Sequence, residues 1–102
     1  MNSAAFQVFG GWFLSKMWMR GAECVETDVE GALVLLDLNG GMYFTLNGPA
    51  ADVWRVLEAP ASEDAIVDAL VAKYEVEPDK CAQSVTRLLQ DLTQKGLAKP
   101  AA

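Results

Sequence analysis

The sequence contains no histidine and only two cysteines, Cys24 and Cys81, which are not in a CxxC arrangement. Most zinc sites need clustered cysteine and histidine ligands, and the common serine and cysteine nucleophiles need a histidine base. The pairs Gly10-Gly11 and Gly40-Gly41 are too short to cradle a phosphate. Each cysteine is expected to behave as a small buried hydrophobe. We therefore expect no enzyme activity, no metal and no cofactor.

Basic residues are also scarce. Eight Lys and Arg stand against 14 Asp and Glu, which gives a formal net charge of −6. Nucleic-acid-binding proteins usually carry a basic patch, so this balance argues against DNA or RNA as the partner. No basic cluster of the kind that holds a protein to anionic lipid is present. Nothing in the cysteine content suggests an oxidising compartment, and we expect a cytoplasmic protein.

A hydrophobic N-terminal extension, residues 1–21, contains the longest run of large apolar side chains. It is too short to span a membrane, and Gly10, Gly11 and Lys16 interrupt it. No positive charge precedes the run and no small-residue cleavage site follows it, so it is not a secretory signal. Three hypotheses stay open: an arm that packs on the domain or on a second copy to form a homodimer, a tail that binds a partner or lipid headgroups, or residues that precede a start at Met17 or Met19.

The remaining chain has the length and composition of one domain. With 102 residues, of which 52% are hydrophobic, it can bury a modest core. We expect the domain to span residues 22–98 and residues 99–102 to form a tail.

Three short strands are expected first. One covers residues 24–27, and the next, residues 32–38, is almost continuously apolar, as in a strand covered on its faces. Asn39-Gly40 is typical of a tight hairpin turn because both residues tolerate positive φ. The third strand, residues 42–46, alternates two sets of side chains between opposite faces. One set is Met42, Phe44 and Leu46, and the other is Tyr43 and Thr45.

Three helices are expected next. Asn47 is a suitable N-cap for the first, with Pro49 in its first turn. Ser62 is placed to cap the second, and the third runs from Pro78 until Lys95-Gly96 ends it. Strands followed by helices predict an α+β domain. Its architecture is expected to be winged-helix-like, with a three-stranded antiparallel sheet followed by three helices.

The third helix is expected to bury one stripe and to expose its flank. The predicted core stripe is Cys81, Val85, Leu88 and Leu92. At 100° per residue, Ala82, Thr86 and Leu89 lie on the flank of that stripe. Leu89 is the most informative of them, because it is apolar beyond what the stripe needs.

These features together resemble the PqqD-like family, whose members bind the leader peptides of ribosomally made, post-translationally modified peptides. The resemblance rests on VLLDLNGGMYFTLNGPAADVWRVLE, EDAIVDALVAKYEVEP and SVTRLLQDLTQKGL, within residues 22–98. The positions that match the family's recurrent features are Tyr43, Leu46, Asn47, Trp54, Leu88, Leu89, Leu92, Gly96 and Leu97.

The resemblance implies that a leader pairs with the free edge of the third strand, while its side chains enter a groove between that strand and the third helix. The implied contact residues are Met42, Tyr43, Phe44, Thr45, Leu46, Ala82, Val85, Thr86 and Leu89. Several of these, such as Phe44, Leu46 and Val85, also suit a purely structural role in the core. The implied partners are the precursor's leader and a modifying enzyme: a leader peptidase or cyclase of a lasso-peptide pathway, or a radical enzyme of pyrroloquinoline-quinone (PQQ) biosynthesis.

Two other functions compete with peptide binding. A winged-helix DNA-binding regulator would need a basic recognition helix, yet residues 77–96 hold three basic and three acidic residues. A dimeric structural subunit would need no peptide, because its N-terminal segment would supply the contact.

Overall fold

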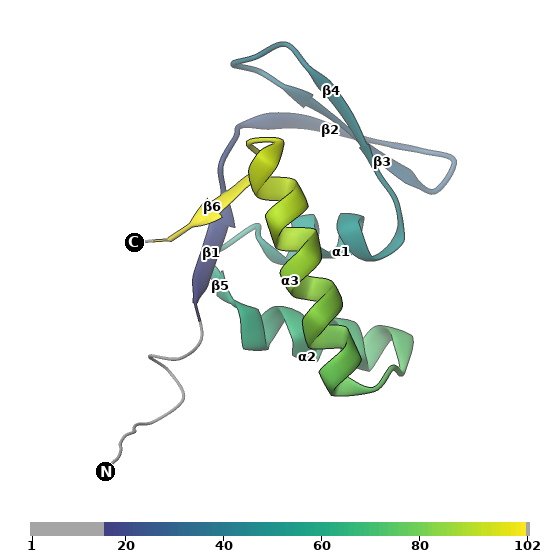
Figure 1. Ribbon diagram of the computed structural model, residues 1–102. Helices are drawn as coiled ribbons and strands as arrows, with labels where there is room; N and C mark the ends of the chain where they lie inside the picture. The colour runs from purple at the N-terminus through teal and green to yellow at the C-terminus, as the bar shows by residue number, and fades with distance from the viewer. Residues whose placement is uncertain (1–15, 102) are drawn as a thin grey trace.

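The computed structural model describes residues 16–101, and the expectations for residues 1–15 lie outside that range (Figure 1). Six strands and three helices follow one another along the described chain. They are β1 (Met17–Arg20), β2 (Cys24–Val29), β3 (Ala32–Asp37), β4 (Tyr43–Leu46), α1 (Gly48–Val56), β5 (Ala61–Ser62), α2 (Glu63–Tyr74), α3 (Pro78–Gln94) and β6 (Ala98–Pro100).

The expected three-stranded antiparallel sheet is present, with the strand order β2-β3-β4. Leu33 of β3 pairs with Leu46 of β4, and Leu35 pairs with Phe44, which confirms the predicted alternation along β4. Leu33, Leu35 and Leu46 are buried, and the helices lie on that side of the sheet (Figure 1). We call this side the inner face. The α+β, winged-helix-like architecture is therefore confirmed.

A second antiparallel sheet, in the order β5-β1-β6, was not expected. β1 lies in the predicted N-terminal extension, and β6 overlaps the predicted tail. Trp18 of β1 is buried, and its Nε1 donates to Glu63 at 3.0 Å. The backbone N–H of Ala101 donates to Met17 O at 2.8 Å, which holds the two ends of the described chain together.

The three helices begin close to the predicted positions. Ser62 Oγ accepts the N–H of Ala65 at 3.1 Å at the start of α2, as expected of an N-cap. Asn47 occupies the N-cap position of α1, but its side chain makes no capping hydrogen bond. In α3, Glu77 accepts the N–H of Asp79 and Pro78 takes the first helical position.

Side chains from both sheets and all three helices share one core. Trp54 of α1, Ile66 of α2 and Val85 of α3 are among its fully buried members. Within residues 16–101, none of the helices is long and apolar enough to cross a bilayer.

Candidate functional site

The third strand of the first sheet, β4, has one open edge. It pairs with β3 on one side, and no other strand in the described part of the chain pairs with it on the other. The opposite edge strand, β2, carries Glu26 and Asp28, and charges of this kind blunt an edge against further pairing. β4 has the sequence YFTL and no charge. Of the two edges of this sheet, β4 is therefore the one without charged side chains that oppose further pairing.

Two residues of β4 direct their backbone groups toward the open edge. Asp37 donates its N–H to Met42 O at 2.9 Å, which fixes the phase of the ladder between β3 and β4. In an antiparallel pair, alternate residues bond across to the partner strand. Phe44 therefore bonds toward β3, whereas the N–H and C=O groups of Tyr43 and Thr45 point away from it.

The predicted contact residues on this strand differ in exposure. Tyr43 is 69% exposed, and Met42, just before the strand, and Thr45 are also exposed. Phe44 is half-buried against the core, while Leu46 is buried. Leu46 is thus a core residue, and it contributes no exposed side chain to a peptide.

On α3 the predicted core stripe is wrong at one position, because Leu89 rather than Leu88 is fully buried. Leu89 is only 1% exposed and belongs to the core, whereas Leu88 is half-buried and faces outward beside it. Val85 is a core residue too. Thr86 Oγ1 donates to Ala82 O at 3.0 Å and lies 3.4 Å from Glu63 Oε1. The side of α3 that carries Ala82 and Thr86 therefore faces the start of α2 rather than β4.

The physical reason is a choice between two helical spacings. A stripe that passes through Val85 continues at either the third or the fourth following residue, and both positions here are leucine. The fold buries the fourth, Leu89, which rotates α3 and brings a different row to the surface next to α1. That row is Ser84, Arg87, Leu88 and Asp91.

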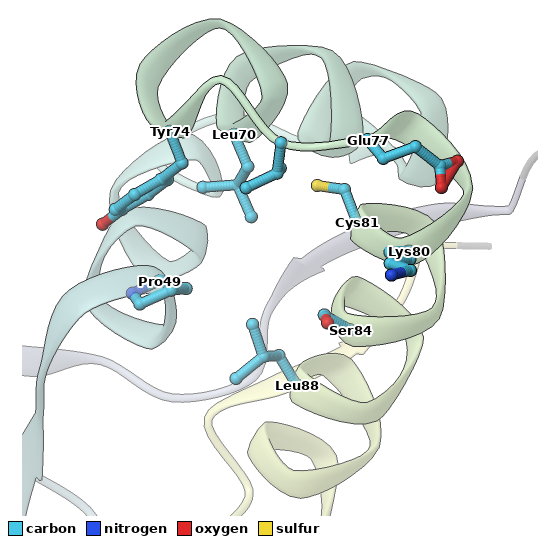
Figure 2. A pocket seen from close by; sticks show the side chains of 9 residues that line it. Pro49, Leu70, Tyr74, Glu77, Lys80, Cys81, Ser84 and Leu88 are labelled. Carbon is cyan, nitrogen blue, oxygen red and sulfur yellow. The ribbon is translucent and has the colours of Figure 1, made fainter.

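Two adjoining cavities form a groove between the start of α1 and α3, which we call the α1–α3 groove. One, of about 550 Å³, begins where β4 ends. The other, of about 430 Å³, continues toward the end of α2 (Figure 2). Both include Pro49, Ser84 and Leu88. The first is completed by Asn47, Ala50, Arg87 and Asp91, and the second by Leu70, Tyr74, Val76, Glu77, Lys80 and Cys81. The lining is mainly apolar, which suits side chains of an extended peptide.

A buried carboxylate fixes one wall of this groove. Asp52 of α1 accepts hydrogen bonds from the Tyr74 hydroxyl and from Lys73 Nζ, the latter at 2.8 Å, and Arg55 lies 3.5 Å away. Burial by itself raises the pKa of Asp52, but the hydrogen bonds from Lys73 and Tyr74 outweigh it and hold that pKa below its usual value. The bond to Asp52 conversely raises the pKa of Tyr74. The Tyr74 ring is thereby held at the groove, as Figure 2 shows.

Residues 16–101 contain no group of three or more His, Cys, Asp or Glu side chains arranged to hold a metal ion. Cys81 is buried beneath the groove, and Cys24 is half-buried with a pKa raised by burial and by the nearby Asp37 carboxylate. A raised pKa keeps a thiol protonated and unreactive.

The fold and the site together define a class of protein. Its members are winged-helix-like domains with an uncharged open strand edge beside an apolar groove. The family model described as "Coenzyme PQQ synthesis protein D (PqqD)" matches residues 32–98. The chain belongs to the PqqD family. No curated protein matches the chain.

Three solved structures are similar over most of the chain. One is "TbiB1 in complex with the TbiA(beta) leader peptide", at 28% identity and a TM-score of 0.71, covering 82% of this chain and 98% of the other. A second is a lasso peptide synthetase B1 complexed with the leader peptide, at 28% identity and a TM-score of 0.67, covering 81% and 98%. A third, the PqqD truncation of Methylobacterium extorquens PqqCD, is 22% identical with a TM-score of 0.62 over 90% and 95%, and it shows the shared fold.

Proposed function

We propose that this protein binds the leader segment of a ribosomally made precursor peptide as a fourth strand on β4 and presents the precursor to a modifying enzyme. The open, uncharged edge of β4 beside the α1–α3 groove carries this proposal. The two structures at 28% identity, each a complex with a leader peptide, support it. The proposed role is recognition in the cytoplasm, without a catalytic step.

In strand addition, backbone hydrogen bonds provide affinity and side-chain contacts provide specificity. The outward N–H and C=O groups of Tyr43 and Thr45 supply hydrogen bonds that any peptide backbone can make, and they provide affinity without sequence preference. Leader side chains on the inner side of the added strand point toward the helices. There the apolar lining around Pro49 and Leu88 would select apolar side chains.

Charged leader residues have two candidate partners at the same place. Arg87 and Asp91 are exposed on α3 and line the part of the groove next to the end of β4. They lie one turn apart and are opposite in sign, so the groove has no strong preference for a leader of one charge.

The lasso-peptide setting is the better supported of the two pathways. One structure at 28% identity is named lasso peptide synthetase B1, and the other, TbiB1, also carries a B1 name, whereas the PqqD truncation is 22% identical. The partner enzyme would then be a leader peptidase or a cyclase. A radical enzyme of PQQ biosynthesis is the alternative within the same family.

A proline in β4 tests strand addition directly. Thr45→Pro removes an N–H that points to the open edge, and proline is tolerated at edge positions of this orientation. Thr45→Ala keeps the N–H and removes the side chain, so it is the matched control. The affinity of both variants for a fluorescently labelled leader, encoded beside the gene for this chain, is measured by anisotropy.

We expect Thr45→Pro to lower leader affinity about tenfold or more, from loss of a backbone hydrogen bond and crowding by the ring, and Thr45→Ala to change it little. Circular dichroism verifies that both variants fold. Equal affinities for the two variants would exclude strand addition at β4. If no leader binds while double-stranded DNA binds in a salt-sensitive manner, the DNA-binding alternative is correct instead.

A further inference from the structure

One side of the β2-β3-β4 sheet faces away from the helices, and we call it the outer face. It is apolar, and no helix or strand among residues 16–101 covers it (Figure 1). The strand register places Val25, Leu36 and Tyr43 in one row across it and Thr27, Val34 and Thr45 in the next, with Val29 beside Ala32 at the far end. Val25 is 50% exposed and Val29 46%. In Figure 1 the helices lie on the opposite side of this sheet.

The same sheet is strongly acidic. Residues 22–47 contain Glu23, Glu26, Asp28, Glu30 and Asp37 and no lysine or arginine. Arg20 and Arg55, from outside the sheet, pair with two of these carboxylates. By the strand register, those two and Asp37 lie on the inner face. Glu23 and Glu30 adjoin the outer face at the two ends of β2, and neither has an ion pair within residues 16–101. Exposed apolar side chains with carboxylates at both ends and no cation among them are typical of a docking surface for a basic-rimmed partner.

A bound leader would extend this face. A fourth strand on β4 alternates its side chains like any strand, so half of them enter the groove and half lie on the outer face next to Tyr43 and Thr45. The second half has no helix of this protein beside it within residues 16–101 (Figure 1). Whatever docks on the outer face therefore contacts both the sheet and the leader.

We propose that the outer face docks the modifying enzyme, through an apolar enzyme surface rimmed by Lys and Arg, and that the enzyme reads the outward leader side chains in the same contact. The proposal rests on the proposed function and deepens it by assigning the enzyme's surface. A second copy of this chain is a poor occupant, because two outer faces, each with Glu23 and Glu30 at its ends and no lysine or arginine on its strands, would repel one another.

The test separates the two binding events. In Val25→Lys/Val29→Lys, both changes lie on β2, on the far side of the sheet from the leader edge. The double variant removes apolar contacts and adds charges opposite a basic rim. Ala72→Lys, at an exposed position of α2, is the matched control. The probe is the modifying enzyme encoded beside this chain, and its association with the chain is measured with and without leader.

We expect the double variant to lose at least tenfold in enzyme affinity, as for loss of central interface contacts. Its leader affinity should stay within about twofold of the wild type, which also shows that it folds. Ala72→Lys should change neither quantity. Unchanged enzyme affinity of the double variant overturns the proposal, and so does a wild-type chain that fails to associate with the enzyme. Absence of leader binding with intact enzyme association would instead reject the proposed function.

A photo-crosslinking benzoylphenylalanine in place of Val29 identifies the occupant. Crosslinks to the enzyme support the proposal. Crosslinks to residues 1–15 of the same chain, or to a second copy, show that the face is covered by the chain itself and overturn it.

Discussion

The hydroxyl of Tyr74 donates a hydrogen bond to the carboxylate of Asp52, which joins the last turn of α2 to the middle of α1. The Asp52 side chain is 11% exposed, and Lys73 and Arg55 complete its ion pairs. A carboxylate this poorly hydrated needs such partners, because an unpaired buried charge is costly. The cluster therefore stabilises the contact between the two helices and orients the Tyr74 ring in the groove wall.

Asp52→Asn should lower the free energy of unfolding by about 1–3 kcal/mol at neutral pH, since it removes a charged acceptor from three donors. The folded-state pKa of Asp52 lies below its ordinary value of about 3.9. Its stabilisation is therefore present above that value and is lost as pH falls through the folded pKa. Urea unfolding at pH 7 and near pH 3 should show that the difference between wild type and variant shrinks in acid.

Asp68→Asn is the matched control for that experiment, because Asp68 is an exposed carboxylate on α2. It should change stability by a few tenths of a kcal/mol. The comparison of the two pH values tests whether the loss in free energy of unfolding caused by Asp52→Asn depends on the carboxylate charge. A loss as large at pH 3 as at pH 7 would show that the missing charge is not the cause of the destabilisation.

The adjacent leucines of α3 should separate folding from binding. Leu89→Ala removes a fully buried side chain and should cost about 2–5 kcal/mol of stability. Leu88→Ala should cost less stability, because Leu88 is only half-buried, but it should weaken leader binding, because Leu88 lines both cavities. Thermal melts and leader anisotropy on both variants check this. Leader binding that is insensitive to Leu88→Ala would remove this groove from the peptide site.

The first sheet and the three helices were predictable because their signals are local. Alternation along β4 and the cap at Ser62 each depend on a few neighbouring residues. The turn between β3 and β4 lies where it was predicted, but its positive φ of 70° falls on Gly41 and not on Asn39 and Gly40, so the expected two-residue turn geometry is wrong. The open edge of β4 follows from the order of the strands along the chain. The second sheet was not predictable, because strands as short as β5 pair with β1 from more than 40 residues away, and their sequences have no period of their own.

The choice between Leu88 and Leu89 as the buried residue of α3 was not predictable for a different reason. The positions of Leu88 and Leu89 differ by 100° around the helix, and both are compatible with a stripe through Val85. Only packing against the other elements decides which leucine is buried. The hydrogen bond of Thr86 to Ala82 O and its contact with Glu63 show, in the structure, which side of α3 faces α2.

Gly21 should resist substitution because of a backbone contact. A Cβ at this position would lie 2.9 Å from the carbonyl oxygen of Gly96, in the turn between α3 and β6, while the Gly21 N–H donates to Leu97 O. Gly21→Ala must push the two segments apart, and we expect it to cost about 1–3 kcal/mol. Gly40→Ala is the control, since its Cβ would meet only side-chain atoms, with Asp37 Oδ2 at 3.2 Å and Met42 Cγ at 3.9 Å, and no backbone. Equal unfolding midpoints in urea for these two variants would contradict the close packing.

Arg20 should stabilise the junction of β1 with α1 through both its charge and its shape. Its guanidinium carbon lies 4.1 Å from the centroid of the Trp54 ring, and its Nη2 and Nε donate to Trp54 O at 2.8 and 3.2 Å. Arg20→Ala should lower the free energy of unfolding by about 1–3 kcal/mol.

Lysine keeps the charge at this position but has no planar fork, so Arg20→Lys should recover only part of the loss. Arg87→Ala, on the exposed face of α3, is the control and should leave stability nearly unchanged. The measurement is urea unfolding followed by tryptophan fluorescence and, independently, by circular dichroism. If Arg20→Lys is as stable as the wild type, charge alone accounts for the contact, and the stacking and paired bonds to Trp54 contribute nothing. If Arg20→Ala is also as stable, β1 is not anchored to the core through this residue.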